Sequence, residues 1–349
     1  MSHCTSCGSQ VNPAAVACPN CGAMVSAPPA GAAVSAQRPL AFHGEGGALL
    51  GIYLVTLFLS IVTIGIYSFW GRTNMRRYLW SMLEFDGDRF GYHGTGGELL
   101  KGWLKALLVV AGIFAVSMVV GLAAGPGGFF LMPLILYGSV LLLIPVAQVG
   151  AWRYRLSRTS YRGIRFSFRG RAATLMGLYF KGSLLMLVTL GFYAPFFTNR
   201  LRKFFCQNAY YGNTAFDYDG EGRDLFGSYV VMVLLLIPTL TLSTVWFQVK
   251  RFNYFWSHTT FTGARFSSTM TFGGFLGLVF TNLLLVIFTL GFGMPWALVR
   301  AIRYTASNLS VSGPLDLAAI QQQVVAAGAT GEELGGFLDG GGTDVGLGM

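Results

Sequence analysis

Val62-Thr-Ile-Gly-Ile-Tyr67 recurs in this chain as Val188-Thr-Leu-Gly-Phe-Tyr193 and as Phe288-Thr-Leu-Gly-Phe-Gly293. Each copy ends an apolar run and is followed by a basic, amphipathic stretch. Self-similarity of this kind is typical of a chain built from internal repeats. The sequence therefore predicts a unit used three times, each with an apolar membrane helix followed by a basic surface helix.

The composition excludes a water-soluble globular protein. Hydrophobic residues make up 53% of the 349 residues and charged residues only 11%, whereas a soluble domain carries about 25% charged residues. The sequence contains no Walker loop, nucleophile elbow or dinucleotide-binding glycine pattern. We therefore expect an integral membrane protein that is not an enzyme.

Six apolar segments are candidates for membrane helices. A span needs about 20 apolar residues, so the uncharged stretch from 106 to 152 must hold two, joined at Gly125-Pro-Gly-Gly128. The segments cover roughly residues 48–69, 99–122, 129–151, 173–197, 225–248 and 273–297. The predicted fold is an all-α, multi-pass membrane domain over residues 40–312.

A second element, Phe-x-Φ-x-Gly, precedes the helices. Turn signals such as Asp86-Gly87 and Arg162-Gly163 stand before most copies, which indicates short β-hairpins on the membrane surface. The copies are Phe90-Gly-Tyr-His-Gly94, Phe166-Ser-Phe-Arg-Gly170 and Phe216-Asp-Tyr-Asp-Gly220, with a truncated copy at Phe42 and a degraded one at Phe266.

The Thr-(Ile/Leu)-Gly-(Ile/Phe)-Tyr element, the basic helix after it and the Phe-x-Φ-x-Gly hairpins together resemble the YjgN family of bacterial inner-membrane proteins. The resemblance covers about residues 40–309. It implies a multi-pass protein of the bacterial inner membrane whose molecular activity is not established, and it supplies no catalytic residues. The N-terminal cysteine motif is an addition that the plainest family members lack.

Four cysteines near the N-terminus have the spacing of a zinc ribbon. Cys4, Cys7, Cys18 and Cys21 form C-x2-C-x10-C-x2-C. Two such pairs complete a tetrahedral thiolate shell with no open position, which predicts a structural Zn²⁺ in a ribbon over residues 1–25. A pair of disulfides is the less favoured alternative, since no secretory signal precedes the motif. Thiolate ligands imply a reducing compartment, hence a cytosolic N-terminus.

The segments that flank the membrane domain carry little structural signal. Residues 26–39 are small and Pro-rich, which predicts a flexible linker, and residues 313–349 read as a Gly-rich, mostly disordered tail. Residues 1–37 contain no Lys, Arg, Asp or Glu, so we expect no nucleic-acid binding. The expected partners are the lipid bilayer and, through the ribbon, another protein or a second copy of the chain.

The positive charges conflict with six simple spans. With a cytosolic N-terminus, such a topology would place 14 Lys and Arg outside and seven inside, the reverse of the usual bias. One explanation is that some segments turn back, with Pro238 breaking the 225–248 segment. The other is that the N-terminus lies outside, which the thiolate ligands argue against. For the orientation of the repeats, the alternative to a segment that turns back is insertion in opposite orientations, as in many transporters. We favour segments that turn back and keep six spans as the default description.

Three polar residues within apolar segments are candidate functional residues. Lys181 is a cation inside a segment, which is a site hypothesis by default, although its side chain is long enough to reach the membrane surface. Gln148 and Gln248 stand at equivalent repeat positions, and we expect them to form hydrogen bonds between helices. Cys206 is expected to act as a small apolar residue.

Two functions fit these features. Interrupted helices in internal repeats favour a transporter or permeation protein with a cytosolic zinc-ribbon interaction module. The alternative is a non-transporting membrane scaffold or lipid-organising oligomer. Charge-lined cavities would favour the first hypothesis, and an apolar molecule without a polar path would favour the second.

Overall fold

The computed structural model describes residues 2–3, 10–11, 37–317 and 320–322. Within residues 37–317 the chain repeats one design five times: a strand, two helices that form a hairpin, and a second strand. The first unit comprises β3 (Arg38–Phe42), α1 (Gly46–Val62), α2 (Ser68–Ser81) and β4 (Leu83–Phe85). The second comprises β5 (Asp88–Tyr92), α3 (Gly96–Ala123), α4 (Gly128–Arg158) and β6 (Thr159–Tyr161), with the 3₁₀ turn η1 (Gly125–Gly127) between its helices.

The remaining three units follow the same order. The third comprises β7 (Ile164–Phe168), α5 (Ala172–Val188), α6 (Ala194–Gln207) and β8 (Ala209–Tyr211). The fourth comprises β9 (Thr214–Tyr218), α7 (Gly222–Leu234), α8 (Leu242–Ser257) and β10 (Thr259–Phe261). The fifth comprises β11 (Ala264–Ser268), α9 (Phe272–Phe288), α10 (Met294–Ser307) and β12 (Leu309–Ser312). Outside the units, β1 (Ser2–His3) pairs with β2 (Gln10–Val11).

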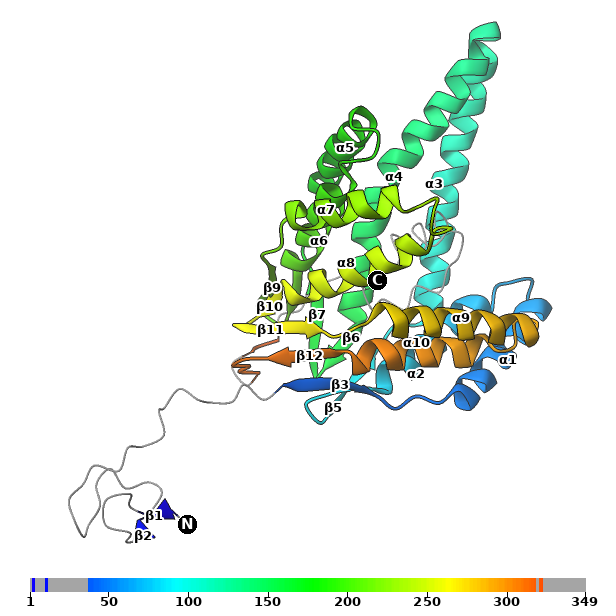
Figure 1. Ribbon diagram of the computed structural model, residues 1–349. Helices are drawn as coiled ribbons and strands as arrows, with labels where there is room; N and C mark the ends of the chain where they lie inside the picture. The colour runs from blue at the N-terminus through cyan, green and yellow to red at the C-terminus, as the bar shows by residue number, and fades with distance from the viewer. Residues whose placement is uncertain (1, 4–9, 12–36, 318–319, 323–349) are drawn as a thin grey trace.

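The strands β3 to β12 form a closed antiparallel barrel in which each strand pairs with the next in sequence. The last strand closes the ring on the first, with Val311 opposite Arg38. All five helical hairpins leave from one rim, and the tight turns between units lie at the other. Figure 1 shows the hairpins fanning out from the barrel. We name the two ends of the barrel the helix rim and the turn rim.

The barrel corrects the prediction of separate surface hairpins. The turns at Asp86-Gly87 and Arg162-Gly163 do join strand pairs, as the sequence predicts. The strands, however, have only three to five residues, and an isolated hairpin of that length is marginal in water. Pairing of all ten in a ring satisfies their backbone groups and leaves no open edge. The fold is therefore mainly helical but not all-α.

The structure also has five units where the sequence analysis predicts three. Successive units begin 50, 76, 50 and 50 residues apart. The three recognised copies are the hairpin tips of the first, third and fifth units. The second tip differs because α3 and α4 are longer, and the fourth because Thr241 replaces the glycine found at Gly65, Gly191 and Gly291.

A threonine holds the tip of each short hairpin. The Thr63 hydroxyl donates to the carbonyl of Leu59 at 2.7 Å and accepts from the amide of Tyr67 at 2.9 Å. Thr189, Thr239 and Thr289 make the same pair of bonds in their units. The hydroxyl thus satisfies groups that two helix ends would leave unpaired. The helix breaks serve to reverse the chain.

Each hairpin returns the chain to the barrel. The 225–248 segment reverses between α7 and α8, in the stretch that contains Pro238. The uncharged parts of the chain, 46–71, 106–152, 182–199, 225–249 and 266–299, contain the five tips. Every Lys and Arg, from Arg38 to Arg303, therefore lies on the barrel side of the tips. The predicted conflict in the charge distribution disappears with this arrangement.

Two of the helices have the length and apolar composition to cross a bilayer. They are Gly96–Ala123 and Phe130–Arg158, each of which contains an 18-residue window with a mean hydropathy of 2.6 and 2.3, respectively. The apolar helices Gly46–Val62, Ala172–Val188 and Phe272–Phe288 are shorter. The tips of the short hairpins carry exposed apolar side chains: Ile64 is 93% exposed and Leu290 89%. Such tips are unfavourable in water.

Side chains on the second helix of each unit join neighbouring units. Arg77 donates to the carbonyl of Gly94, Arg153 to that of Gly170, and Arg303 to that of Gly44 at 2.7 Å. Asn199 and Asn253 make the corresponding bonds to Gly220 and Met270. The bond from Arg303 connects the fifth unit to the first, 259 residues away in sequence. Five equivalent contacts therefore close the ring at the helix rim.

The predicted zinc ribbon lies outside the described residues, apart from β1 and β2. The residues outside the description include all four predicted zinc ligands, Cys4, Cys7, Cys18 and Cys21. The ribbon over residues 1–25 and its Zn²⁺ stay predictions. The structure differs in part from the predicted disordered tail over residues 313–349, because residues 313–317 and 320–322 pack against the barrel.

Candidate functional site

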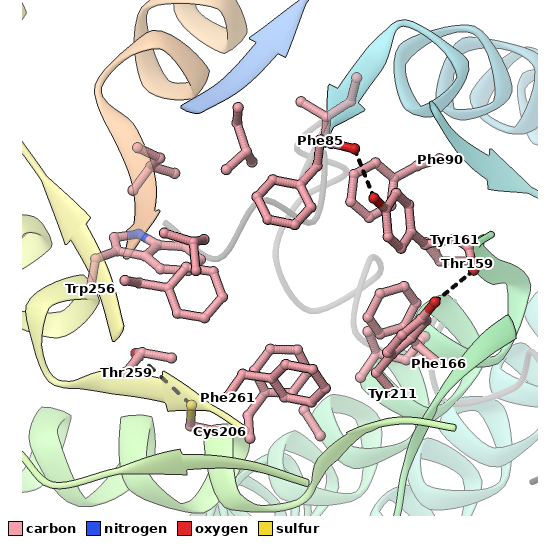
Figure 2. A pocket seen from close by; sticks show the side chains of 18 of the residues that line it. Phe85, Phe90, Thr159, Tyr161, Phe166, Cys206, Tyr211, Trp256, Thr259 and Phe261 are labelled. Atoms are coloured by element: carbon pink, nitrogen blue, oxygen red, sulfur yellow. Dashed lines mark hydrogen bonds between the residues drawn. The ribbon is translucent and has the colours of Figure 1, made fainter. Parts of the chain in front are cut away.

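The barrel encloses a cavity of about 270 Å³, which we call the chamber. Alternate residues of a strand point to the same side of a sheet, so each strand turns some of its side chains into the barrel. Each unit contributes to the wall one residue from its first strand and one from its second strand. The pairs, each joined across two strands, are Leu40 with Phe85, Phe90 with Tyr161, Phe166 with Tyr211, Phe216 with Phe261, and Phe266 with Val311. Figure 2 shows many of the side chains that line this space.

The aromatic rings of the chamber contact one another around the barrel. The centroids of Phe90 and Tyr161 are 4.7 Å apart, and those of Phe216 and Phe261 are 4.5 Å apart. Rings at such distances add to the stabilisation from burial. Tyr161 donates its hydroxyl to the carbonyl of Phe85 at 2.7 Å, and Tyr211 donates to the carbonyl of Tyr161 at 2.9 Å (Figure 2). Both phenol hydroxyls therefore donate their hydrogen bonds to backbone carbonyls of the barrel wall.

The C-terminal segment covers the chamber at the turn rim. Leu315 and Leu317 line the chamber, and Ile320 is 6% exposed in the same apolar cluster. Gln322 accepts a hydrogen bond from the amide of Arg165 at 2.6 Å. Arg165 is on β7, which stands five strands from β12 in the ring of ten. The described residues 315–317 and 320–322 therefore lie at the mouth of the barrel and reach β7 on the side opposite β12.

Tryptophans and other bulky residues line the chamber toward the helix rim. Trp80, Trp152 and Trp256 come from the second helices of the first, second and fourth units. The third and fifth units have the smaller Cys206 and Ala306 at the positions equivalent to Trp80 and Trp256. The side chains at these two positions are therefore smaller than the tryptophans.

Arg202 is the one charged side chain among the described residues that line the chamber. It lies on α6 one turn before Cys206, and its Nη2 is 3.4 Å from the hydroxyl of Thr259. The Cys206 thiol lies 4.0 Å from the same hydroxyl (Figure 2). Burial lowers the pKa of the Arg202 guanidinium below its ordinary value and raises the pKa of the Cys206 thiol. Arg202, Cys206 and Thr259 form one polar spot in a wall that is otherwise mostly apolar, with Thr159 and Thr305 as the other threonines that line it.

The three residues predicted as membrane candidates do not line the chamber. Lys181 is exposed on α5, at the same position in its unit as Lys105 on α3. Gln148 accepts a hydrogen bond from the Tyr179 hydroxyl at 2.8 Å, which joins α4 to α5. Gln248 is exposed on α8. Among the described residues, no three His, Cys, Asp or Glu side chains come together as a metal site requires.

Sequence reasoning missed the chamber, although a signal for it was present. An apolar residue stands directly before each tight turn or chain reversal at the turn rim: Phe85, Tyr161, Tyr211, Phe261 and Val311. The last four are spaced by 50 residues. Arg202 was not distinguished from the surface arginines because the basic stretch that contains it also has residues that are exposed, such as Arg200 and Lys203.

The chain was compared with known families, curated proteins and solved structures. Residues 37–244 and 227–337 match the model of a family described as "Bacterial protein of unknown function (DUF898)". Inner membrane protein YjgN of Escherichia coli strain K12 is 34% identical over 150 residues, which is 43% of this chain and 36% of that protein. The YjgN protein of Salmonella typhimurium is 31% identical over 155 residues, 44% of this chain and 37% of that protein. No solved structure matches.

The chain thus covers little more than a third of the length of these relatives. Their names give a location, the inner membrane, and no activity.

Proposed function

Since the chain belongs to the DUF898 family of bacterial proteins, whose matched relatives are inner-membrane proteins, we propose that it binds one apolar molecule from the inner membrane within its barrel. The observation that carries this proposal is the chamber of about 270 Å³ with an almost wholly apolar wall. An apolar cavity of about 150 Å³ already holds benzene. The chamber has room for a larger molecule.

The position of the chamber relative to the hairpins supports a ligand that comes from lipid. Closed barrels that are slightly too wide for their side chains to fill can hold one small ligand. Here the turn rim is covered by Leu315, Leu317 and Ile320, while the helix rim faces the apolar hairpins. A ligand that leaves the bilayer would enter from the helix rim.

The depth of the hairpins follows from their charges. Lys105 and Lys181 are both the tenth residue of their helix, and we place the membrane surface near this level. Beyond it, α3 continues to Ala123 for about 27 Å, close to the thickness of the hydrocarbon core, whereas α5 ends at Val188 after about 10 Å. On this basis α3 and α4 cross the membrane, and the four short hairpins enter one leaflet.

The chamber favours the second of the two hypotheses drawn from the sequence. A transported polar solute or ion needs a path lined by polar groups, but Arg202 is the one charged residue of the chamber wall within the described chain. We therefore propose lipid or apolar-ligand binding in place of transport. That the chain is not an enzyme, that residues 1–25 hold Zn²⁺ and that the ribbon contacts a protein partner stay predictions.

Binding of dodecanol, an uncharged single-chain probe, tests the proposal. Purified protein in lipid nanodiscs is titrated with isotope-labelled dodecanol, and bound probe per chain is measured by native mass spectrometry. Empty nanodiscs correct for partition into lipid. We expect saturation at one dodecanol per chain.

Two variants locate the bound probe. The double variant Ala209→Phe/Ala306→Phe fills the chamber and is expected to abolish saturable binding, because both alanines line it. Ala215→Phe adds the same ring on β9 next to the inward-facing Phe216, on the other face of the strand, and should retain binding. Circular dichroism and gel filtration check that each variant folds. No saturable binding to the wild-type protein, or equal binding to the filled variant, would contradict the proposal.

A further inference from the structure

Arg202 has almost no internal partner. Its Nη2 makes one long hydrogen bond, 3.4 Å, to Thr259, and its Nε is buried without a hydrogen-bond acceptor. Within the described residues no carboxylate forms an ion pair with it. The carboxylate of Asp217, on β9, instead accepts hydrogen bonds from Gln207 and from the amide of Tyr218.

Aromatic rings replace only part of the missing interactions. The guanidinium carbon of Arg202 lies 5.0 Å from the ring centroid of Trp256 and 5.8 Å from that of Phe255. Ring faces attract a cation, but they do not accept the directed hydrogen bonds of a guanidinium. A buried, unpaired charge is unfavourable unless an anion or hydrogen-bond acceptors reach it.

Five units form the chamber wall, and among their described residues only the third unit places a charged one in it. The positions equivalent to Arg202 are Arg76, Trp152, Phe252 and Ile302. Of these, only Trp152 lines the chamber. A ligand with one charged end and one apolar chain would therefore bind in a single orientation, with its head at Arg202 and its chain along the aromatic pairs.

We infer that the chamber ligand is a single-chain amphiphile with an anionic carboxylate or phosphate head, which Arg202 binds inside the barrel. A guanidinium presents several donors in a plane, the geometry that matches these two anions. The Thr259 hydroxyl, which donates to the Phe255 carbonyl at 2.8 Å, holds Nη2 in place. The inference rests on the proposed function and specifies the chemistry of its ligand.

The test compares three probes with the same chain: dodecanoate, dodecyl phosphate and dodecanol. Each is titrated into the full-length protein in nanodiscs of zwitterionic lipid, with native mass spectrometry as the readout. We expect both anions to bind at one per chain and more tightly than dodecanol. Lipid extracted from the purified protein, analysed by mass spectrometry, then shows whether the native head is a carboxylate or a phosphate.

Arg202→Met keeps the length of the side chain and removes its charge. We expect this variant to lose roughly tenfold to a hundredfold in affinity for the anions and to bind dodecanol as before. Arg200→Met, two residues away on the exposed side of α6, is the matched control and should leave all three affinities unchanged. Arg202→Lys should recover part of the anion affinity.

The outcomes separate the two proposals. If the wild-type protein binds dodecanol and the anions equally, and Arg202→Met changes neither, the anionic head is refuted while the apolar chamber stands. If none of the three probes binds saturably, the proposed function itself is refuted. A fall in dodecanol binding equal to that of the anions in Arg202→Met would indicate a structural role for Arg202 and would also refute the inference.

Discussion

Tyr161 carries a hydroxyl whose position makes the barrel sensitive to alkaline pH. It is 3% exposed, it donates to the Phe85 carbonyl, and burial raises its pKa to about 12. In the unfolded chain the pKa of tyrosine is about 10. The folded state therefore keeps the proton between pH 10 and pH 12 while the unfolded state loses it, so that the stability contributed by Tyr161 is complete below pH 10 and is lost across this interval.

The substitution Tyr161→Phe should reduce the loss of stability between pH 10 and pH 12. We expect the apparent melting temperature of the variant to fall less steeply than that of the wild-type protein between pH 10 and pH 12. At neutral pH the variant should be less stable by about 1 kcal/mol, because the buried Phe85 carbonyl loses its donor. Phe261 occupies the equivalent position of the fourth unit, which indicates that the ring alone fits. An unchanged alkaline slope would contradict the assignment.

At the scale of the elements, all four short hairpin tips place a residue other than glycine in the left-handed region, and the fourth tip places a second one there. Thr241 has a φ of 71°, in the left-handed region, whereas Gly65, Gly191 and Gly291 occupy that position elsewhere with φ between 85° and 93°. A β-branched residue is disfavoured there by about 1–2 kcal/mol. Thr241→Gly should therefore stabilise the protein by about 1 kcal/mol, after allowance for the greater freedom of glycine in the unfolded chain.

The reciprocal exchange provides the control. Gly191→Thr places the same side chain at the equivalent tip of the third unit and should destabilise it by a similar amount. Thermal unfolding of both variants in the same detergent checks the pair. A destabilised Thr241→Gly together with a tolerated Gly191→Thr would show that the tips are set by packing and not by the backbone.

The same elements explain how much of the fold could be predicted. The apolar helices and the turn at Asp86-Gly87 were predictable, because hydropathy and turn residues are local properties. The five Phe-x-Φ-x-Gly copies even mark the five first strands, since Leu40 stands where the others have Phe90, Phe166, Phe216 and Phe266. Strands of three to five residues carry too little pattern to reveal that they pair in a ring, so the barrel was not predictable.

The candidate site could be predicted even less. A chamber exists only once five units are closed on one another, and closure depends on contacts such as Arg303 with Gly44, which are far apart in sequence. Arg202 differs from Arg200 and Lys203 only in the direction of its side chain into the barrel. Direction on a helix follows from packing, which local sequence does not determine. Lys181 is exposed on α5 and does not line the chamber, and its role as a membrane residue stays a prediction.

At the scale of the whole molecule, the ring of units requires that all its turns face one side. The strands are antiparallel and each hairpin returns to the barrel, so Arg162, Asn213 and Thr262 all lie at the turn rim. Units inserted in alternating orientations could not form this barrel. With charged residues confined to the barrel side, the positive-inside rule predicts that the turn rim faces the cytosol.

Thiol labelling of intact cells with a membrane-impermeant reagent tests this topology. Single cysteines replace the exposed residues Arg162, Asn213 and Thr262, and a fourth replaces Ala123 at the end of α3. The background is Cys206→Ala, because Ala306 at the equivalent position shows that alanine fits; this parent also reports any labelling of the N-terminal cysteines. We expect labelling at position 123 alone, and at the other three only after permeabilisation.

Labelling of 162 and 262 from outside, but not of 213, would place on opposite sides of the membrane turns that the barrel holds at one rim. It would refute the closed ring in the membrane and restore six crossings and the transporter hypothesis. Absence of labelling at 123 would instead leave the barrel intact and show that α3 and α4 end within the bilayer.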